Sequence, residues 1–233
     1  TFTLAAITAY IAMLREERGR DLSSLTKCGT GGAPVPPSVV AQFAACFGVA
    51  IHNTYGLTES NSASHLSPLG VAGPVDPASG ALAIGLPIAN STASIVDLAE
   101  PSRVLGPGET GEIALEGPMM FAGYWNRPES TEAAFCAGRF LTGDIGVMDE
   151  RGWFYIVDRK KDMIVASGFK VWPREVEDVL YQHPAVREAA VVGDPDEYRG
   201  ETVRAGVALK AGAVVSAEEL VPFCKARMAA YKY

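Results

Sequence analysis

The chain has 233 residues, 48% of them hydrophobic and 20% charged, which is typical of a globular protein with one large domain or two smaller ones. Its formal net charge of −7 argues against a nucleic-acid-binding protein, because no basic field is available to release counterions from phosphates. The four cysteines, at positions 28, 46, 136 and 224, lack the Cys-x-x-Cys spacing of zinc or redox sites. Reduced cysteines in a cytoplasmic protein are therefore expected.

The first 14 residues, TFTLAAITAYIAML, are the most apolar stretch. They are too short for a membrane span and include Thr and Tyr, so we predict a buried helix here. A second helix is predicted over residues 38–47, which follow Pro36-Pro37, and a strand over residues 49–55. This α/β pattern places a loop suited to a ligand beyond the carboxyl end of a strand.

From about Ile84 the pattern changes to short strand-like runs separated by Gly/Pro turns. These runs cover residues 91–98, 111–117 and 153–158. They predict an antiparallel β-rich subdomain.

A compact α+β unit is predicted after Arg159. Its elements are a helix over 173–183, strands over 186–194 and 201–210, and a helix over 216–228. Ser216 and Glu219 form a capping-box pattern at the start of the last helix, whereas Pro222 near its middle disfavours it.

The segment Tyr55-Gly56-Leu57-Thr58-Glu59 combines groups that a nucleotide needs. It offers an aromatic stacking face, a glycine for close backbone approach, a hydroxyl for phosphate and a hard oxygen ligand for Mg²⁺. The alternative is a loop that enters a capped helix. Residues 29–34 are also glycine-rich, but Pro34 breaks the G-x-G-x-x-G pattern and no phosphate-loop motif occurs. This stretch suits either a flat ligand or a strand-to-helix turn.

Three further segments have both a functional and a structural interpretation. Asp144 follows a glycine and could accept hydrogen bonds from a ribose diol or belong to a turn. The basic run 159–161 suits a joint between domains, a phosphate contact or a solvated turn. Gly168 and Lys170 lie on a hairpin-like loop that could meet a ligand.

In this order, five stretches resemble the adenylate-forming superfamily of acyl-CoA synthetases, peptide-synthetase adenylation domains and luciferases. They are GTGGAPVP, YGLTES, GEIALEGPMMFAGYWNRPEST, FLTGDIGVMDERGWFYIVDRKKDMIVASGFKVWPREVE and VVGDPDEYRGE. The resemblance implies a mixed α/β and α+β fold. Residues 1–158 would form the C-terminal portion of the large AMP-binding domain, with an α/β part over 1–83 and a β-rich part over 84–158. A hinge over 159–161 and a small C-terminal lid domain over 162–233 would follow.

The resemblance also implies a two-step reaction with ATP, Mg²⁺ and CoA. A carboxylic acid would be converted to an acyl-adenylate with release of pyrophosphate, and the CoA thiol would then displace AMP. Leu57 favours fatty-acyl and aryl-CoA ligases, because peptide-synthetase domains more often have Pro there. Two alternatives are an adenylation domain that loads a carrier-protein thiol and a non-catalytic nucleotide-binding relative.

Carried over by position, the resemblance implies the following site. Catalytic roles fall on Thr58, which would contact phosphate, and Glu59, which would hold Mg²⁺. The ATP site would be lined by Gly31, Gly32, Ala33, Tyr55 (stacked on adenine), Gly56, Leu57, Asp144 (on the ribose, helped by Arg159), Ile156 (behind the base) and Lys170. Lys161 would be the pivot of the hinge, and Gly168 with Phe169 would lie beside the pantetheine of CoA.

Two features of the superfamily do not occur in these 233 residues. One is the Ser/Thr/Gly-rich phosphate loop ending in Pro-Lys-Gly, expected before Thr1, and the other is the Gly-Lys segment with the catalytic lysine, expected after AAYKY. Lys232 is not that lysine. We therefore expect a piece of a longer enzyme that lacks adenylation activity by itself. The sequence specifies neither the acid nor an oligomeric state, and it assigns no role to His52.

Overall fold

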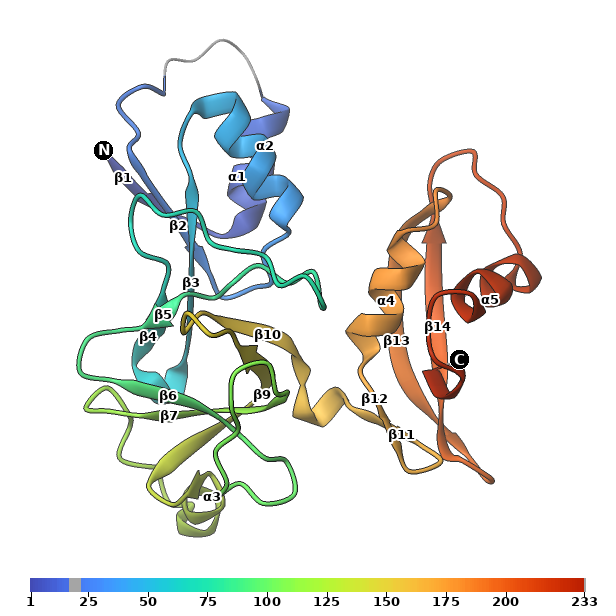
Figure 1. Cartoon of the computed structure of the whole chain (residues 1–233). Coiled ribbons are helices and arrows are strands. Elements are labelled where there is room, and N and C mark those ends of the chain that lie inside the picture. Colours follow the sequence, from blue (N-terminus) through green and yellow to red (C-terminus); the bar gives the residue numbers. More distant parts are fainter. Residues whose placement is uncertain (17–21, 233) are drawn as a thin grey trace. The chain divides into compact units, whose positions relative to one another are not determined.

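The computed structural model describes residues 1–16 and 22–232 (Figure 1). The chain forms two compact units, Thr1–Ile156 and Val157–Tyr233, each with its own hydrophobic core. No helix among the described residues is long and apolar enough to cross a membrane. The mixed α/β and α+β architecture predicted from the sequence is confirmed.

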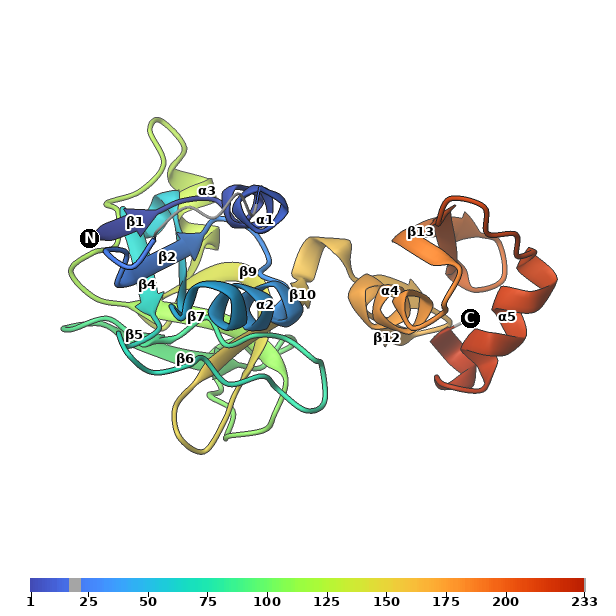
Figure 2. The same cartoon turned by 90° about the horizontal axis from the view of Figure 1, so that it is seen from above.

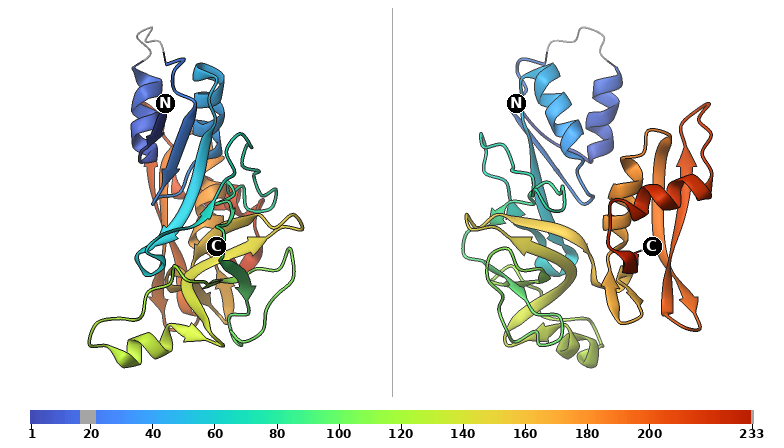
Figure 3. Two further views of the ribbon diagram at one scale, coloured as in Figure 1. Left: turned by 90° about the vertical axis from the view of Figure 1, so that its left-hand side faces the viewer. Right: turned by 45° about the vertical axis from the view of Figure 1, so that its right-hand side comes forward.

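The first unit begins with a five-stranded sheet in the order β1-β2-β3-β4-β5. Its strands are β1 (Phe2–Leu4), β2 (Lys27–Gly31), β3 (Ile51–Leu57), β4 (Ser62–Leu66) and β5 (Leu86–Pro87). The first three strands are parallel, and β4 and β5 are antiparallel to their neighbours. Helices α1 (Ile7–Arg15) and α2 (Pro37–Phe47) lie against one face of the parallel strands (Figure 3).

The predicted buried helix over residues 1–14 is only partly correct. Residues 2–4 form the edge strand β1, whose backbone pairs in parallel with β2, and the helix begins at Ile7. Phe2 and Leu4 are 66% and 64% exposed, because alternate side chains of this short edge strand point outward. In α1 the buried side chains are Ile7 and Tyr10, and the Tyr10 hydroxyl donates to the Gly29 carbonyl oxygen at 2.8 Å. An apolar run alone could not distinguish this strand from the first turn of a helix.

The second sheet of this unit has the order β10-β9-β7-β6, and its β6–β7 and β7–β9 pairs are antiparallel, as predicted. Its strands are β6 (Thr92–Val96), β7 (Gly111–Glu116), β9 (Arg139–Met148) and β10 (Phe154–Arg159), with the short β8 (Phe135–Cys136) paired to β9. Helix α3 (Pro128–Ala133) precedes β8. The strands enclose a core of Ile95, Ile113, Leu115 and Phe154.

The second unit is a four-stranded antiparallel sheet with two helices packed against one side (Figure 2). Its elements are β11 (Ile164–Ala166), β12 (Phe169–Val171), α4 (Pro173–Tyr181), β13 (Val186–Asp196), β14 (Gly200–Leu209) and α5 (Ala217–Lys225). The capping box is present, with the Ser216 amide donating to Glu219 Oε2 at 3.1 Å. Pro222 lies within α5 and does not break it, but the helix ends at Lys225, three residues earlier than predicted.

Candidate active site

The segment Tyr55–Glu59 lies at the carboxyl end of β3. The strand continues through Leu57, two residues beyond its predicted end, and the next three residues form a single 3₁₀ turn, Thr58–Ser60. The alternative of a capped helix is thus met only by this single 3₁₀ turn, and no α-helix begins here. The Ser60 hydroxyl closes the turn, since it accepts from the Leu57 amide at 3.0 Å and lies 2.7 Å from the Ser62 carbonyl oxygen. Thr58 is exposed and Glu59 half-buried at this strand end.

Two glycines allow the backbone to pass closely beside neighbouring strands. A Cβ at Gly56 would lie 1.9 Å from the Ser62 carbonyl oxygen, and one at Gly31 would lie 2.3 Å from Thr54 Oγ1. Both positions therefore require glycine for strand packing, whether or not a ligand approaches. Gly32, with φ of +79° and open space around it, makes the turn that follows β2, where Ala33 is also exposed.

Tyr55 on β3 and Asp144 on β9 meet directly. The Tyr55 hydroxyl donates to Asp144 Oδ2 at 2.5 Å. The Tyr55 ring lies 5.7 Å from the His65 ring, and Tyr55, Leu57 and Ile156 pack against the same apolar cluster. The structure thus brings together four residues that the sequence singled out from three separate segments.

A buried carboxylate holds the irregular part of β9 that contains Asp144. Glu112 on β7 is only 2% exposed, and its Oε1 accepts from the Gly143 amide at 2.8 Å. The Thr142 hydroxyl donates to the Ile113 carbonyl oxygen at 2.8 Å and accepts from the Asp144 amide at 3.1 Å. A buried carboxylate must be paired to be tolerated, and here the pairing fixes the backbone beside Asp144. Glu112 was not among the residues predicted from the sequence; its signal is a carboxylate inside the otherwise apolar run GEIAL.

Glu59 contacts the segment that follows β7. The Tyr124 hydroxyl donates to Glu59 Oε1 at 2.8 Å, and the Phe121 amide donates to the Glu59 carbonyl oxygen at 2.8 Å. Burial, together with the hydrogen bond to Glu59, raises the pKa of the Tyr124 hydroxyl. Among the described residues, no three His, Cys, Asp or Glu side chains group to hold a metal. Mg²⁺ does not require such a group, because it is usually bound by one or two carboxylates together with substrate phosphates and water.

Two histidines of the first sheet are buried. His65 on β4 is fully buried between the rings of Tyr55 and Phe154, and burial lowers its pKa to about 3. His52 on β3 is 5% exposed, and burial lowers its pKa as well. Both imidazoles are neutral at neutral pH and belong to the packing of the sheet.

The remaining predicted site residues lie in the second unit and are exposed: Arg159, Lys161, Gly168, Phe169 and Lys170. Lys161 is in a 3₁₀ turn, Lys160–Asp162. The predicted hairpin-like loop is present: β11 and β12 pair across a two-residue turn in which Ser167 and Gly168 are both at positive φ. Phe169 stacks on Tyr231 with ring centroids 4.7 Å apart.

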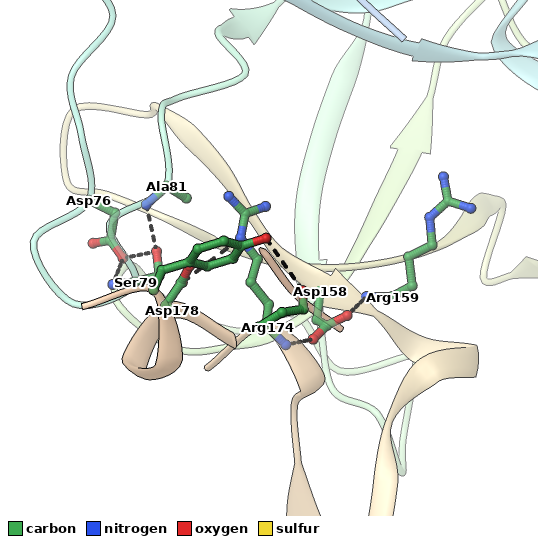
Figure 4. A network of polar contacts seen from close by, with 9 residues as sticks. Asp76, Ser79, Ala81, Asp158, Arg159, Arg174 and Asp178 are labelled. Carbon is green, nitrogen blue, oxygen red and sulfur yellow. Dashed lines mark hydrogen bonds and ion pairs between the residues drawn. The ribbon is translucent and has the colours of Figure 1, made fainter. Parts of the chain in front are cut away.

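Asp158 ties the start of this unit to helix α4. Its two carboxylate oxygens accept from the backbone amides of Arg159, at 2.7 Å, and Arg174, at 3.0 Å (Figure 4). The second bond satisfies an amide of the first turn of α4, which has no partner within the helix. The contact spans the predicted hinge residues 159–161.

Residues 1–125 match the family of AMP-binding enzymes, and residues 175–233 match the C-terminal domain of AMP-binding enzymes. The chain therefore belongs to the AMP-binding enzyme family, the adenylate-forming superfamily that the sequence resembles.

Among curated relatives, a long-chain-fatty-acid–CoA ligase of Bacillus subtilis is 44% identical over 97% of this chain and 40% of its own length. A feruloyl-CoA synthase of Amycolatopsis is 37% identical over the whole chain and 46% of its own length. This chain thus spans less than half the length of the relatives it matches.

Two solved structures are similar to this chain over its whole length. ATP-bound MatB from Rhodopseudomonas palustris is 30% identical, with a TM-score of 0.87 and 45% of its chain covered. The o-succinylbenzoate–CoA synthetase of Bacillus subtilis in complex with ATP and magnesium is 33% identical, with a TM-score of 0.79 and 46% of its chain covered.

Proposed function

We propose that the full-length protein containing this chain is an acid–thiol ligase that converts a carboxylic acid to its CoA thioester with consumption of ATP. The acid carboxylate attacks the α-phosphorus of ATP, the bond to the β-phosphate breaks, and pyrophosphate leaves. The CoA thiol then attacks the acyl carbonyl of the adenylate and AMP leaves. A long-chain fatty acid is the favoured substrate and an aryl acid the second, because the relatives include ligases for both and the fatty-acid ligase is the more similar.

The observation that carries this proposal is the convergence of Tyr55, Asp144 and Glu59 at one end of β3. In the proposed site, the Tyr55 ring faces adenine, with Leu57 and Ile156 supplying apolar surface beside it. Asp144 accepts hydrogen bonds from the ribose hydroxyls, and Thr58 donates to a phosphate oxygen. Gly31, Gly32, Ala33 and Gly56 would line the adenine and acyl pocket.

Glu59 is the residue proposed to hold Mg²⁺. When bound, Mg²⁺ neutralises charge that develops on the phosphate oxygens during adenylation. Glu59 suits this role, because its carboxylate is only half-buried and lies in the turn next to the Thr58 hydroxyl.

For the second unit we propose the role of a lid that pivots at residues 159–161. Arg159 would assist Asp144 at the ribose, Lys170 would approach phosphate, and Gly168 with Phe169 would lie beside the CoA pantetheine. A pivot at Lys161 would break the Asp158–Arg174 bond, so that bond would favour one of the two lid states. Lys161→Pro tests this: proline restricts φ at the proposed pivot, so one half-reaction should slow much more than the other.

A polypeptide of these 233 residues alone is proposed to lack adenylation activity. It spans 40% of the length of the Bacillus subtilis ligase, and its sequence contains no Ser/Thr/Gly-rich phosphate loop. Acid-dependent exchange of pyrophosphate into ATP by this polypeptide would overturn that view.

The function is tested with the full-length protein and a panel of short, long-chain and aryl acids. Two signals are measured, acid-dependent ATP–pyrophosphate exchange and CoA thioester formation. We expect both signals, strongest with long-chain fatty acids. Exchange without transfer to CoA, but with transfer to a carrier-protein thiol, would favour the carrier-loading alternative. No exchange with any acid would contradict the proposal.

A further inference from the structure

The carboxylate of Glu59 is oriented by a tyrosine 65 positions away in the sequence. Tyr124 donates its hydroxyl hydrogen to Glu59 Oε1 at 2.8 Å. A carboxylate on a flexible side chain can rotate, and a hydrogen bond to one oxygen fixes the direction in which the other oxygen points. The contact therefore limits the orientations that Glu59 can offer to a ligand.

The Tyr124 ring is held in place by contacts that do not involve its hydroxyl. Its backbone amide donates to Thr131 Oγ1 at 2.9 Å, and its ring packs edge-on against Phe121 at 4.8 Å between centroids. The preceding Gly123 has φ of +143°, and a Cβ there would meet Thr131 Cγ2 at 2.8 Å. Removing the hydroxyl should thus leave the ring where it is.

The backbone around Glu59 is joined to the same segment. The Phe121 amide donates to the Glu59 carbonyl oxygen at 2.8 Å, and Asn61 Nδ2 donates to the Met119 carbonyl oxygen at 2.7 Å. These two bonds fix the turn Thr58–Ser60 relative to residues 119–124. The hydroxyl bond then adds the last constraint, on the side-chain carboxylate.

We propose that Tyr124 is a positioning residue that orients the Glu59 carboxylate toward the metal of a bound metal–nucleotide complex. The inference rests on the proposed function, because it assumes that Glu59 holds Mg²⁺. Mg²⁺ demands near-ideal octahedral geometry, so a carboxylate already aimed at the ion should bind it better than one free to rotate. Tyr124 itself does not contact the metal or the nucleotide in this account.

The test uses the full-length protein and its Tyr124→Phe variant. The first measurement is the Kd for Mn²⁺, read from the electron paramagnetic resonance signal of the ion. It is made at saturating α,β-methylene-ATP, an analogue that cannot transfer AMP to the acid. The second is the Kd for the same analogue in EDTA, without metal. Tyr198→Phe is the matched control, because it removes a hydroxyl from a tyrosine that is 93% exposed in the other unit.

We expect Tyr124→Phe to raise the Kd for Mn²⁺ about 10-fold, which is typical for loss of a residue that orients a metal ligand. The metal-free Kd of the analogue should stay unchanged, and Tyr198→Phe should match the wild type in both. An unchanged Mn²⁺ Kd in Tyr124→Phe would overturn the inference. Equal weakening with and without metal would also overturn it, because it would indicate general damage to the site. Failure of the proposed function is seen separately, as absence of acid-dependent exchange in the wild-type protein.

Discussion

The Tyr55 hydroxyl donates a hydrogen bond of 2.5 Å to Asp144 Oδ2, and this bond links β3 of the first sheet to β9 of the second. It joins two residues 89 positions apart that were each selected for a nucleotide contact. Because the acceptor is a carboxylate, the bond is of the stronger, charge-assisted kind. The bond therefore both preorganises the candidate site and holds the two sheets of the first unit together.

Tyr55→Phe should lower the free energy of unfolding by about 2 kcal/mol, the typical contribution of a hydrogen bond to a charged group. The ring and its packing are retained, so the loss reports the hydroxyl alone. Urea denaturation of the variant measures it, with Tyr198→Phe as the control. Equal stability of Tyr55→Phe and the wild type would show that the bond contributes nothing in solution.

Gly56→Ala should destabilise the first unit by about 1–3 kcal/mol, the usual cost of overpacking. The added methyl would meet the Ser62 carbonyl oxygen at 1.9 Å, which forces β3 and β4 apart. Gly73→Ala is the matched control, since a Cβ there would have its nearest neighbour at 3.7 Å. Thermal unfolding of both variants should show a lowered midpoint only for Gly56→Ala; similar midpoints would refute the close approach.

Glu112→Ala should weaken ATP binding, although Glu112 is not proposed to contact the nucleotide. The substitution leaves the Gly143 amide without this acceptor, next to Asp144. We expect a raised KM for ATP and a loss of about 1–3 kcal/mol in unfolding free energy. Glu112→Gln keeps an acceptor oxygen, so its KM for ATP and its free energy of unfolding should both be close to those of the wild type. If Gln is as damaging as Ala, the hydrogen bond to Gly143 is not the reason that Glu112 matters.

The stability of the protein should fall as the pH is lowered below about 6.5, in part through His65. Burial lowers the pKa of this histidine to about 3 in the folded state, so between these pH values the unfolded state binds the extra proton. His65→Phe keeps a ring between Tyr55 and Phe154 and should flatten the pH dependence by up to about 1.4 kcal/mol per pH unit. Urea denaturation between pH 7 and 4.5 measures how the free energy of unfolding changes with pH. An equal slope in His65→Phe and the wild type would contradict the lowered pKa of His65.

Much of the fold follows from local pattern. Helix α2 after Pro36 and the capping box at Ser216 were predictable because each depends on neighbouring residues. The strands after Ile84 were predictable because Gly/Pro turns separate their strand-like runs. The edge strand β1 was not, since three residues become a strand only through pairing with β2, which lies about 25 positions away.

The candidate site also contains residues that could be predicted from the sequence and residues that could not. The segment Tyr55–Glu59 and Asp144 could be selected as ligand-binding types from the sequence. Tyr124 could not, because its importance comes from a partner 65 positions distant. Glu112 left one local signal, a carboxylate within an apolar run, but its partner Gly143 is 31 positions distant. Sequence reasoning finds the residues that face a ligand more easily than the residues that hold them in position.

We propose that the end of β3 forms a metal–nucleotide site for acid activation. The most direct test is the rate of acid-dependent ATP–pyrophosphate exchange by the full-length protein at saturating Mg²⁺, compared between wild type and Glu59→Ala. The account predicts clear exchange by the wild type and a loss of about 100-fold in the variant, comparable to removal of a charge-stabilising group from an active site. A wild-type rate in Glu59→Ala would contradict it.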